Sequence, residues 1–272
     1  MTYQTILQHQ VYLHSALADI YINGSQKSNV VFFFKELFKL DKHCMEMRLS
    51  VVNAQFPVSW YLINSTNNTF YVTISGVTNQ YIFPEGNYNI SSFISQFNSL
   101  VSGITATYNV KTNIMTFSAL SNNFIFSDGD NSIFPLIGFV KGISYSSASF
   151  TLTAPFPYNF SGIPRINIKS SSFNIKNIDA YNKGRTRTLA TVPINANQNG
   201  VVQYVNFTNF KTVFKNMELT SVQLEIMDDF KNYIDFKNCD WTICLQFDVL
   251  SEIVDDMDTL EDVYVKEGMP KM

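Results

Sequence analysis

The sequence of 272 residues is poor in charge, cysteine and histidine. Only 15% of its residues are charged, where an average soluble protein has about 25%. The three cysteines, Cys44, Cys239 and Cys244, are too few and odd in number for a disulfide framework. We therefore expect folding in a reducing, intracellular environment, in which the Asn-X-Ser/Thr sequons of this Asn-rich chain are not glycan sites.

Signals for export and for membrane insertion are also lacking. The first residues, MTYQTILQHQ, have neither the positive start nor the apolar run of a signal peptide. Apolar runs such as VVFFF (30–34) are far too short to cross a bilayer. With a net charge of −3, the whole chain gives no reason to expect a nucleic-acid binder.

Aromatic residues are abundant, with 24 Phe and 14 Tyr, so most of the chain is expected to be well packed rather than disordered. The few charges are unevenly placed: residues 49–164 contain Glu85, Lys111, Asp128, Asp130 and Lys141, and the other 36 of the 41 charges lie in the flanks. This shift predicts an inserted module with a surface of Asn, Ser, Thr, Gln and Tyr.

One helix is predicted inside the module, at about 89–102, after the turn Pro84–Gly86. Asn89 is a suitable N-cap and Gly103 a suitable stop. Apolar residues three and four apart form one face of this helix: Ile90, Phe93, Ile94, Phe97, Leu100 and Val101. The opposite face is uncharged, with serines, Gln96 and Asn98.

Strand patterns surround this helix. Residues 69–75 and 104–110 alternate apolar and polar side chains, and 111–113 turn the chain back to form a hairpin. A short helix is marginal alone in water, whereas burying an apolar side chain contributes roughly 1.5–3 kcal/mol. The helix should therefore lie on the hairpin sheet, which makes residues 61–146 a small inserted α+β domain.

The flanks predict longer strands with stronger charge alternation. Three strands precede the module and five follow it: 18–24, 29–34, 44–52, 165–173, 188–194, 201–207, 217–227 and 241–250. Eight antiparallel strands suit a single jelly roll. We therefore predict a mainly β fold with an N-terminal arm and the first jelly-roll strands in 1–60, the second part in 147–250, and an acidic C-terminal tail in 251–272.

Several segments resemble the penton and minor capsid proteins of virophages, polinton-like viruses and related large DNA viruses. The module carries, in this order, NNTFYVTI (67–74), YIFPEGNYNISSFISQFNSL (81–100), ITATYNVKTNIMTFSA (104–119), FIF (124–126) and IFPLIGF (133–139). The segment VQLEIMDDFKNYIDFKNCDWTICLQFDV (222–249) is similar to the last two strands of the penton jelly roll.

This resemblance implies a non-enzymatic structural protein of the virion, with the insert projecting as a second domain. It implies a homopentamer at the capsid vertex that contacts the major capsid protein and other minor capsid proteins, after folding in the host cytoplasm or a viral factory. A fibre-like or lectin-like attachment protein, more typically trimeric, is the alternative from another functional class.

No residues predict catalysis or a cofactor. The histidines are His9, His14 and His43, without metal-binding spacing, and Cys239 and Cys244 lack the second pair that a zinc site needs. Four acids near the C-terminal strands could form a carboxylate cluster for calcium or acid/base chemistry, or a solvated hairpin turn: Asp228, Asp229, Asp235 and Asp240. The turn interpretation is favoured because no Gly-bearing calcium loop accompanies them.

Two charged segments suggest a subunit contact. Residues 182–188 (NKGRTRT) hold a basic loop with Lys183, Arg185 and Arg187, and residues 248–272 hold eight acids against two lysines. The tail also carries apolar residues at near-helical spacing. It could be a solvated, disordered segment, or it could dock on a neighbouring subunit with acids such as Asp255, Asp256 and Asp258 near the basic loop. Three cations bind phosphate poorly at physiological salt, which disfavours a nucleic-acid role.

The surface of the module has two interpretations. An uncharged surface is cheap to desolvate in a subunit contact. Alternatively, it is the exposed cap of a vertex, where groups such as Tyr81, Asn87 and Tyr88 could touch host glycans. We favour the exposed cap.

Overall fold

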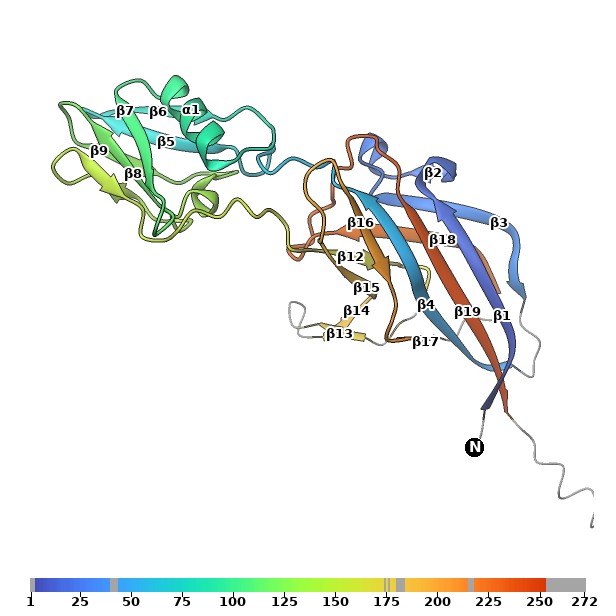
Figure 1. The fold of residues 1–272 in the computed structure, drawn as a ribbon. Coiled ribbons are helices and arrows are strands. Elements are labelled where there is room, and N and C mark those ends of the chain that lie inside the picture. Colours follow the sequence, from blue (N-terminus) through green and yellow to red (C-terminus); the bar gives the residue numbers. More distant parts are fainter. Residues whose placement is uncertain are drawn as a thin grey trace, which may run out of the picture. The chain divides into compact units, whose positions relative to one another are not determined.

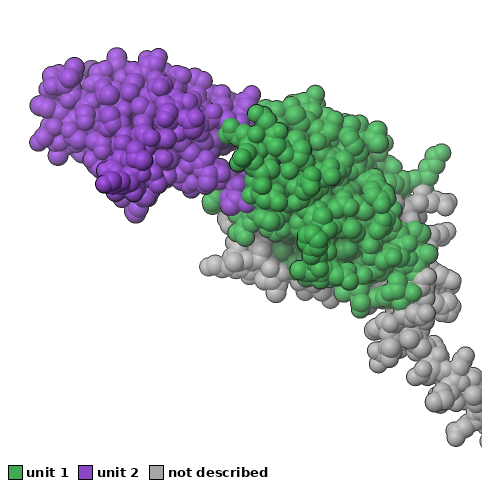
Figure 2. Space-filling view, viewed as in Figure 1, with its two compact units in different colours: residues 1–59, 165–272 green, residues 60–164 purple. Residues whose placement is uncertain are grey.

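The computed structural model describes residues 3–39, 44–173, 175, 177–179, 184–214 and 218–252. Within these residues the chain is mainly β, with antiparallel sheets and one α-helix. The chain divides into two compact units (Figure 2): unit 1 comprises residues 1–59 and 165–272, and unit 2 comprises residues 60–164. No helix among the described residues is long and apolar enough to cross a membrane.

Unit 1 contains two five-stranded sheets (Figure 1). Sheet A has the order β1-β19-β4-β16, and β17 also pairs with β4. Its strands are β1 (Tyr3–His14), β4 (Cys44–Pro57), β16 (Val201–Val205), β17 (Thr212–Phe214) and β19 (Thr242–Glu252). Sheet B has the order β15-β12-β18-β3-β2. Its strands are β2 (Ile20–Tyr21), β3 (Asn29–Lys39), β12 (Arg165–Lys169), β15 (Thr188–Pro193) and β18 (Glu218–Met227). A small ribbon pairs β13 (Asn177–Asp179) with β14 (Gly184–Thr186).

The core of unit 1 contains the apolar face predicted for the last strand. Trp241 and every second residue to Val249 are buried, and Cys244 and Asp248 of the alternate positions are buried as well. The Trp241 ring lies 6.1 Å from the ring of Phe56 and 6.4 Å from that of Phe32. Strands far apart in sequence are thus joined by the aromatic residues that the composition indicated.

Two features at the N-terminus differ from the prediction. Residues 3–14 form a full strand instead of an arm, because β1 pairs along its length with β19, which would otherwise be an open edge. The predicted strand 18–24 shrinks to β2 between two 3₁₀ turns, η1 (Ser15–Leu17) and η2 (Gly24–Gln26). The Asn23 amide binds Ser28 Oγ at 2.7 Å and closes the second turn, so side-chain bonds compete with strand pairing.

Unit 2 contains a four-stranded and a three-stranded sheet. The first has the order β10-β9-β5-β6, with β5 (Thr69–Ile74), β6 (Val77–Ile82), β9 (Phe124–Ser127) and β10 (Tyr145–Ser146). The second has the order β11-β8-β7, with β7 (Ile104–Asn109), β8 (Ile114–Ala119) and β11 (Thr151–Thr153). The β7–β8 pair is the predicted hairpin.

The predicted helix is present as α1 (Ile90–Leu100), and Asn89 caps it in a capping box with Ser92. Its face lies on the hairpin as expected: the rings of Phe97 and Phe117 are 5.0 Å apart, and the Ala106 N–H donates to Asn98 Oδ1 at 2.7 Å. Phe97 also stacks on Phe70 at 5.8 Å, so the helix joins both sheets into one core.

Unit 2 extends beyond residue 146, where the predicted module ended. Residues 147–164 remain within it because β11 pairs with β8. The Phe160 ring packs 5.2 Å from that of Phe93, and the Tyr158 N–H donates to the Asn113 carbonyl at 2.9 Å. These contacts join segments far apart in sequence.

Candidate subunit interface

Among the exposed apolar side chains of unit 1 we single out two groups, which we name for the strands beside them. The β2 patch comprises Leu17, Ile20, Ile22 and Phe33. The β16 patch comprises Val205, Phe207, Phe210 and Val213. Exposed apolar clusters of this kind mark interaction surfaces in soluble proteins.

The β2 patch arises because β3 is apolar on both faces. Val30 and Phe32 point into the core, whereas Phe33 is 57% exposed on the other side of the strand. Ile20 pairs with Val31 and so lies on that same outer face. Leu17, 76% exposed, precedes this pair at the end of η1. The outer face of the β2–β3 edge is therefore apolar.

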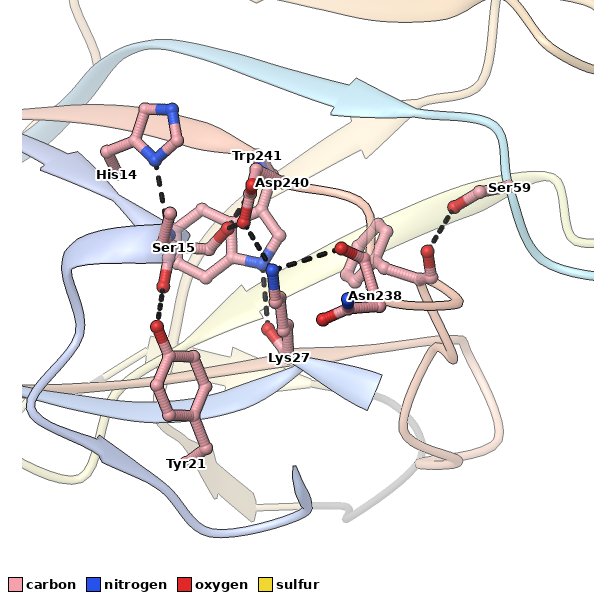
Figure 3. A network of polar contacts seen from close by, with 10 residues as sticks. His14, Ser15, Tyr21, Lys27, Ser59, Asn238, Asp240 and Trp241 are labelled. Atoms are coloured by element: carbon pink, nitrogen blue, oxygen red, sulfur yellow. Dashed lines mark hydrogen bonds and ion pairs between the residues drawn. The ribbon is translucent and has the colours of Figure 1, made fainter. Parts of the chain in front are cut away.

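A polar network holds the segment that carries the β2 patch (Figure 3). Lys27 Nζ donates to Asp240 Oδ1 at 2.7 Å, and Ser15 Oγ donates to the same oxygen at 2.9 Å. The Trp241 ring N–H donates to the Lys27 carbonyl at 2.7 Å, and the Tyr21 hydroxyl donates to the Ser15 carbonyl at 2.7 Å. These bonds join both 3₁₀ turns to the start of β19 and so position the segment that carries the patch.

Electrostatics supports this network. The hydrogen bond from Lys27 lowers the pKa of Asp240, against a smaller opposing effect of burial, and Ser15 adds to the lowering. Asp240 is therefore ionised at neutral pH and retains its ion pair with Lys27.

The β16 patch is held by Asn206. Its side-chain oxygen accepts from the Phe210 N–H at 3.2 Å, and its amide donates to the Phe210 carbonyl at 2.9 Å. Its backbone N–H donates to the Val52 carbonyl of β4 at 2.9 Å. A closed turn results, in which Phe207 is 91% exposed.

A buried carboxylate anchors the end of the same turn. Asp248 of β19 is 2% exposed and accepts bonds from Lys211, Gln8 and Gln246. Burial raises the pKa of this carboxyl, but the hydrogen bonds from these three side chains outweigh it, so the pKa is lowered overall. Lys211 lies between the turn and β17, which ties the β16 patch to the centre of sheet A.

The two patches lie at opposite sides of unit 1. Residues of β15 and β16 line a common groove, so these two strands border the same side. Strand β2 is at the other end of sheet B. A contact between copies that joins a β2 patch to a β16 patch is head-to-tail, the arrangement that closes cyclic rings.

The predicted basic loop and acidic tail lie largely outside the described residues: Lys183, Asp255, Asp256 and Asp258 are among those outside. Arg185 belongs to β14 and pairs there with Ile178. Arg187 is exposed, and its carbonyl accepts from the Ser170 N–H at 3.1 Å. The predicted contact between loop and tail stays a prediction.

The three residues named for the surface of the module have packing roles. Asn87 is exposed, but its side-chain oxygen accepts from the Leu62 N–H at 2.7 Å. Tyr81 is half-buried and stacks on Phe70 at 5.5 Å. Tyr88 is half-buried, lies edge-on to Phe83, and donates its hydroxyl proton to the Pro84 carbonyl at 2.9 Å. Each of these side chains supports unit 2 itself.

The four carboxylates near the C-terminal strands have separate partners. Asp228 accepts from the Phe230 and Asn232 N–H groups at 2.8 Å and so closes a turn. Arg165 binds Asp229, Lys237 binds Asp235, and Lys27 binds Asp240. Among the described residues no three His, Cys, Asp or Glu side chains gather as metal ligands. Cys239 is exposed and Cys244 is buried, and burial raises the pKa of the Cys244 thiol.

Neither apolar patch was predicted from the sequence, although the sequence of each contains an indication of it. VVFFF is apolar at successive positions, so a strand made of it must present apolar residues on both faces. NFTNF (206–210) places two Phe in a turn-forming, Asn-rich segment, where burial is difficult.

The two-sheet unit with a second domain inserted between β4 and β12 is a penton-like fold of the kind found in virophages. The mavirus penton protein matches it with a TM-score of 0.51 at 12% identity, over 91% of this chain and 100% of that chain. A chain in the structure of the Sputnik virophage matches at TM-score 0.44 and 13% identity, over 88% of this chain and 97% of that chain. The fold assignment rests on the first match. No family model and no curated protein matches the sequence.

Proposed function

We propose that this chain is a structural protein of a virus capsid, a penton protein that stands at the vertex. The observation that carries the proposal is the fold shared with the mavirus penton protein along its whole length, insert included. The sequence resemblance of the module and of the last two strands points the same way.

Unit 1 is proposed to be a jelly roll. Eight of its strands support this: β1, β3, β4, β12, β15, β16, β18 and β19. Taken in chain order, these strands lie in sheets A, B, A, B, B, A, B and A. Two interlocking Greek keys produce such an order.

Assembly is proposed to proceed through the two patches. The β2 patch of one copy packs on the β16 patch of the next, and five such contacts close a ring. The ring occupies the capsid vertex, where its outer edges contact the major capsid protein and other minor capsid proteins. Two exposed Phe residues, Phe33 and Phe207, supply the apolar contact, and aromatic residues of this kind dominate the energetics of many interfaces.

A mixing experiment tests the head-to-tail contact. Phe33→Asp spoils only the β2 patch, and Phe207→Asp spoils only the β16 patch, so each variant alone should remain monomeric. A mixture of the two retains one intact contact, so native mass spectrometry should detect mixed dimers and no rings. Leu120→Asp makes the same apolar-to-acid change at a 96% exposed position of unit 2, outside both patches, and is the control that should assemble like the unchanged chain.

If the β2 patch instead bound another β2 patch, or the β16 patch another β16 patch, each variant would pair with itself through its intact patch. Mixed dimers would then be absent. Circular dichroism of each variant checks that the fold is retained. Self-pairing of either variant, or rings from both, would overturn the proposed contact.

A further inference from the structure

A groove of about 1050 Å³ in unit 1 adjoins the β16 patch and shares Phe210 with it. It is bounded by the edge strands β15 and β16, by β12, and by the turns at 206–210 and 229–231. Val51 and the buried Leu189 form part of its lining. It lies wholly within one unit of the fold.

The groove carries positive charge. Arg165, Lys169 and Lys231 line it, and Asp229 is the one acid among the described lining residues. Asp229 is bound to Arg165, whose Nε lies 2.7 Å from its Oδ2. With three cations and one acid, the described lining favours an anionic occupant. Because the groove removes such an occupant partly from water, its ion pairs are screened less than on an open surface.

Besides these charged residues, the groove has apolar side chains and strand edges. Phe230 is 71% exposed beside the groove, Phe210 lies at the opposite turn, and Tyr204 contributes a half-buried ring. Among the described strands, β15 and β16 each end the strand order of their sheet. Edge strands present backbone groups to which an extended peptide can add. These features favour a peptide with both acidic and apolar side chains.

The chain itself contains such a peptide. Residues 253–272 hold six acids and two lysines, together with Ile253, Val254, Met257, Leu260 and Tyr264. They follow Glu252, the last residue of β19. Leu245 of β19 pairs with Val51 of the groove, and the path from Glu252 back to Leu245 spans about 23 Å at roughly 3.3 Å per residue. Twenty extended residues can reach about 66 Å, so the segment is long enough to enter the groove.

We propose that the groove binds the acidic C-terminal segment 253–272, with its carboxylates at Lys169 and Lys231 and its apolar residues against Phe210 and Phe230. The segment of the same copy or of a neighbour makes the same contacts. The proposal goes beyond the assembly of the ring, because it concerns a site that each copy carries.

Photo-crosslinking in the full chain tests the proposal. Leu260 is replaced by p-benzoylphenylalanine, the protein is irradiated, and the joined peptides are identified by mass spectrometry. The expected cross-links join residue 260 to peptides that contain residues 165–169, 188–191, 204–210 or 229–231. Cross-links that fall mainly elsewhere, or none above the level of a urea-unfolded sample, would overturn the proposal.

A pair of charge variants tests the role of the lysines. The double substitution Lys169→Glu and Lys231→Glu should lower the yield of groove cross-links roughly fivefold. Lys111→Glu with Lys141→Glu makes the same change of net charge in unit 2 and should leave the yield unchanged. Equal yields in the two variants would contradict the charge contacts. The cross-links of the chain with unchanged lysines test the proposal even if a charge variant fails to fold. Native mass spectrometry measures ring formation separately, so a failure of the groove proposal can be told apart from a failure of the proposed ring.

Discussion

At the residue scale, Gly138 has the closest backbone approach of the glycines in unit 2. Its φ is +85°, and an added Cβ would lie 2.1 Å from the Phe156 carbonyl oxygen. The Phe156 N–H in turn donates to the Gly138 carbonyl at 3.1 Å, so the two backbones cannot separate without losing this bond. This contact ties residues 147–164 to the rest of unit 2.

Gly138→Ala should therefore lower the free energy of unfolding of unit 2 by at least about 3 kcal/mol. Gly142→Ala is the matched control, because Gly142 has a similar φ of +80° but no heavy atom within 4 Å of its added Cβ. The control substitution should lower the free energy of unfolding by only about 1–2 kcal/mol, which is the penalty of placing a Cβ on a left-handed backbone. Urea unfolding of both variants measures the difference, and equal midpoints would show that the contact with Phe156 is unimportant.

Asp248 gives unit 1 a defined response to acid. Its pKa is lowered in the folded state relative to an ordinary value of about 3.9. The carboxylate thus contributes stability that is fully present above pH ~4 and is lost as the pH falls through the lowered folded value. Asp248→Asn should reduce stability at neutral pH and weaken its decline below pH ~4.

Unfolding followed by tryptophan fluorescence in a Trp60→Phe background measures this response, because the remaining Trp241 is buried in unit 1. Asp130→Asn, at an exposed position in unit 2, is the control and should keep the pH dependence of the unchanged chain. An identical acid response of Asp248→Asn and the unchanged chain would rule out this role for Asp248.

At the scale of elements, the helix and the long strands could be predicted because their periodicity is local. The buried face of α1 and the alternation of β19 follow from spacings of three to four and of two residues. Strand β1 was missed because its role as a strand depends on pairing with β19, more than 200 residues away. Similarly, Arg165 and Asp229 are 64 residues apart in sequence, and their ion pair depends on the fold.

The extent of unit 2 allows a direct test. A fragment of residues 60–164 retains β11 and the packing of Phe160 on Phe93, whereas a fragment of residues 60–146 lacks both. The longer fragment should unfold cooperatively on heating, and the shorter one should lose its near-ultraviolet aromatic signal or melt at a clearly lower temperature. Circular dichroism compares the two, and equal melting curves would show that residues 147–164 do not stabilise the unit.

At the scale of the whole molecule, the two units differ in their content of charged residues. All five charged residues of positions 49–164 fall in unit 2, and the other charges of the chain lie in unit 1. Unit 1 also carries both apolar patches and the basic groove. We therefore expect assembly to depend on unit 1 and to persist when the surface of unit 2 is changed.

The native mass of the vertex complex released from particles that contain this protein tests the penton assignment most directly. The account predicts a mass of five chains, each of 31.0 kDa, and fivefold symmetry in averaged electron-microscopy images of the same complex. A stable trimer, as expected for a fibre-like attachment protein, would contradict it.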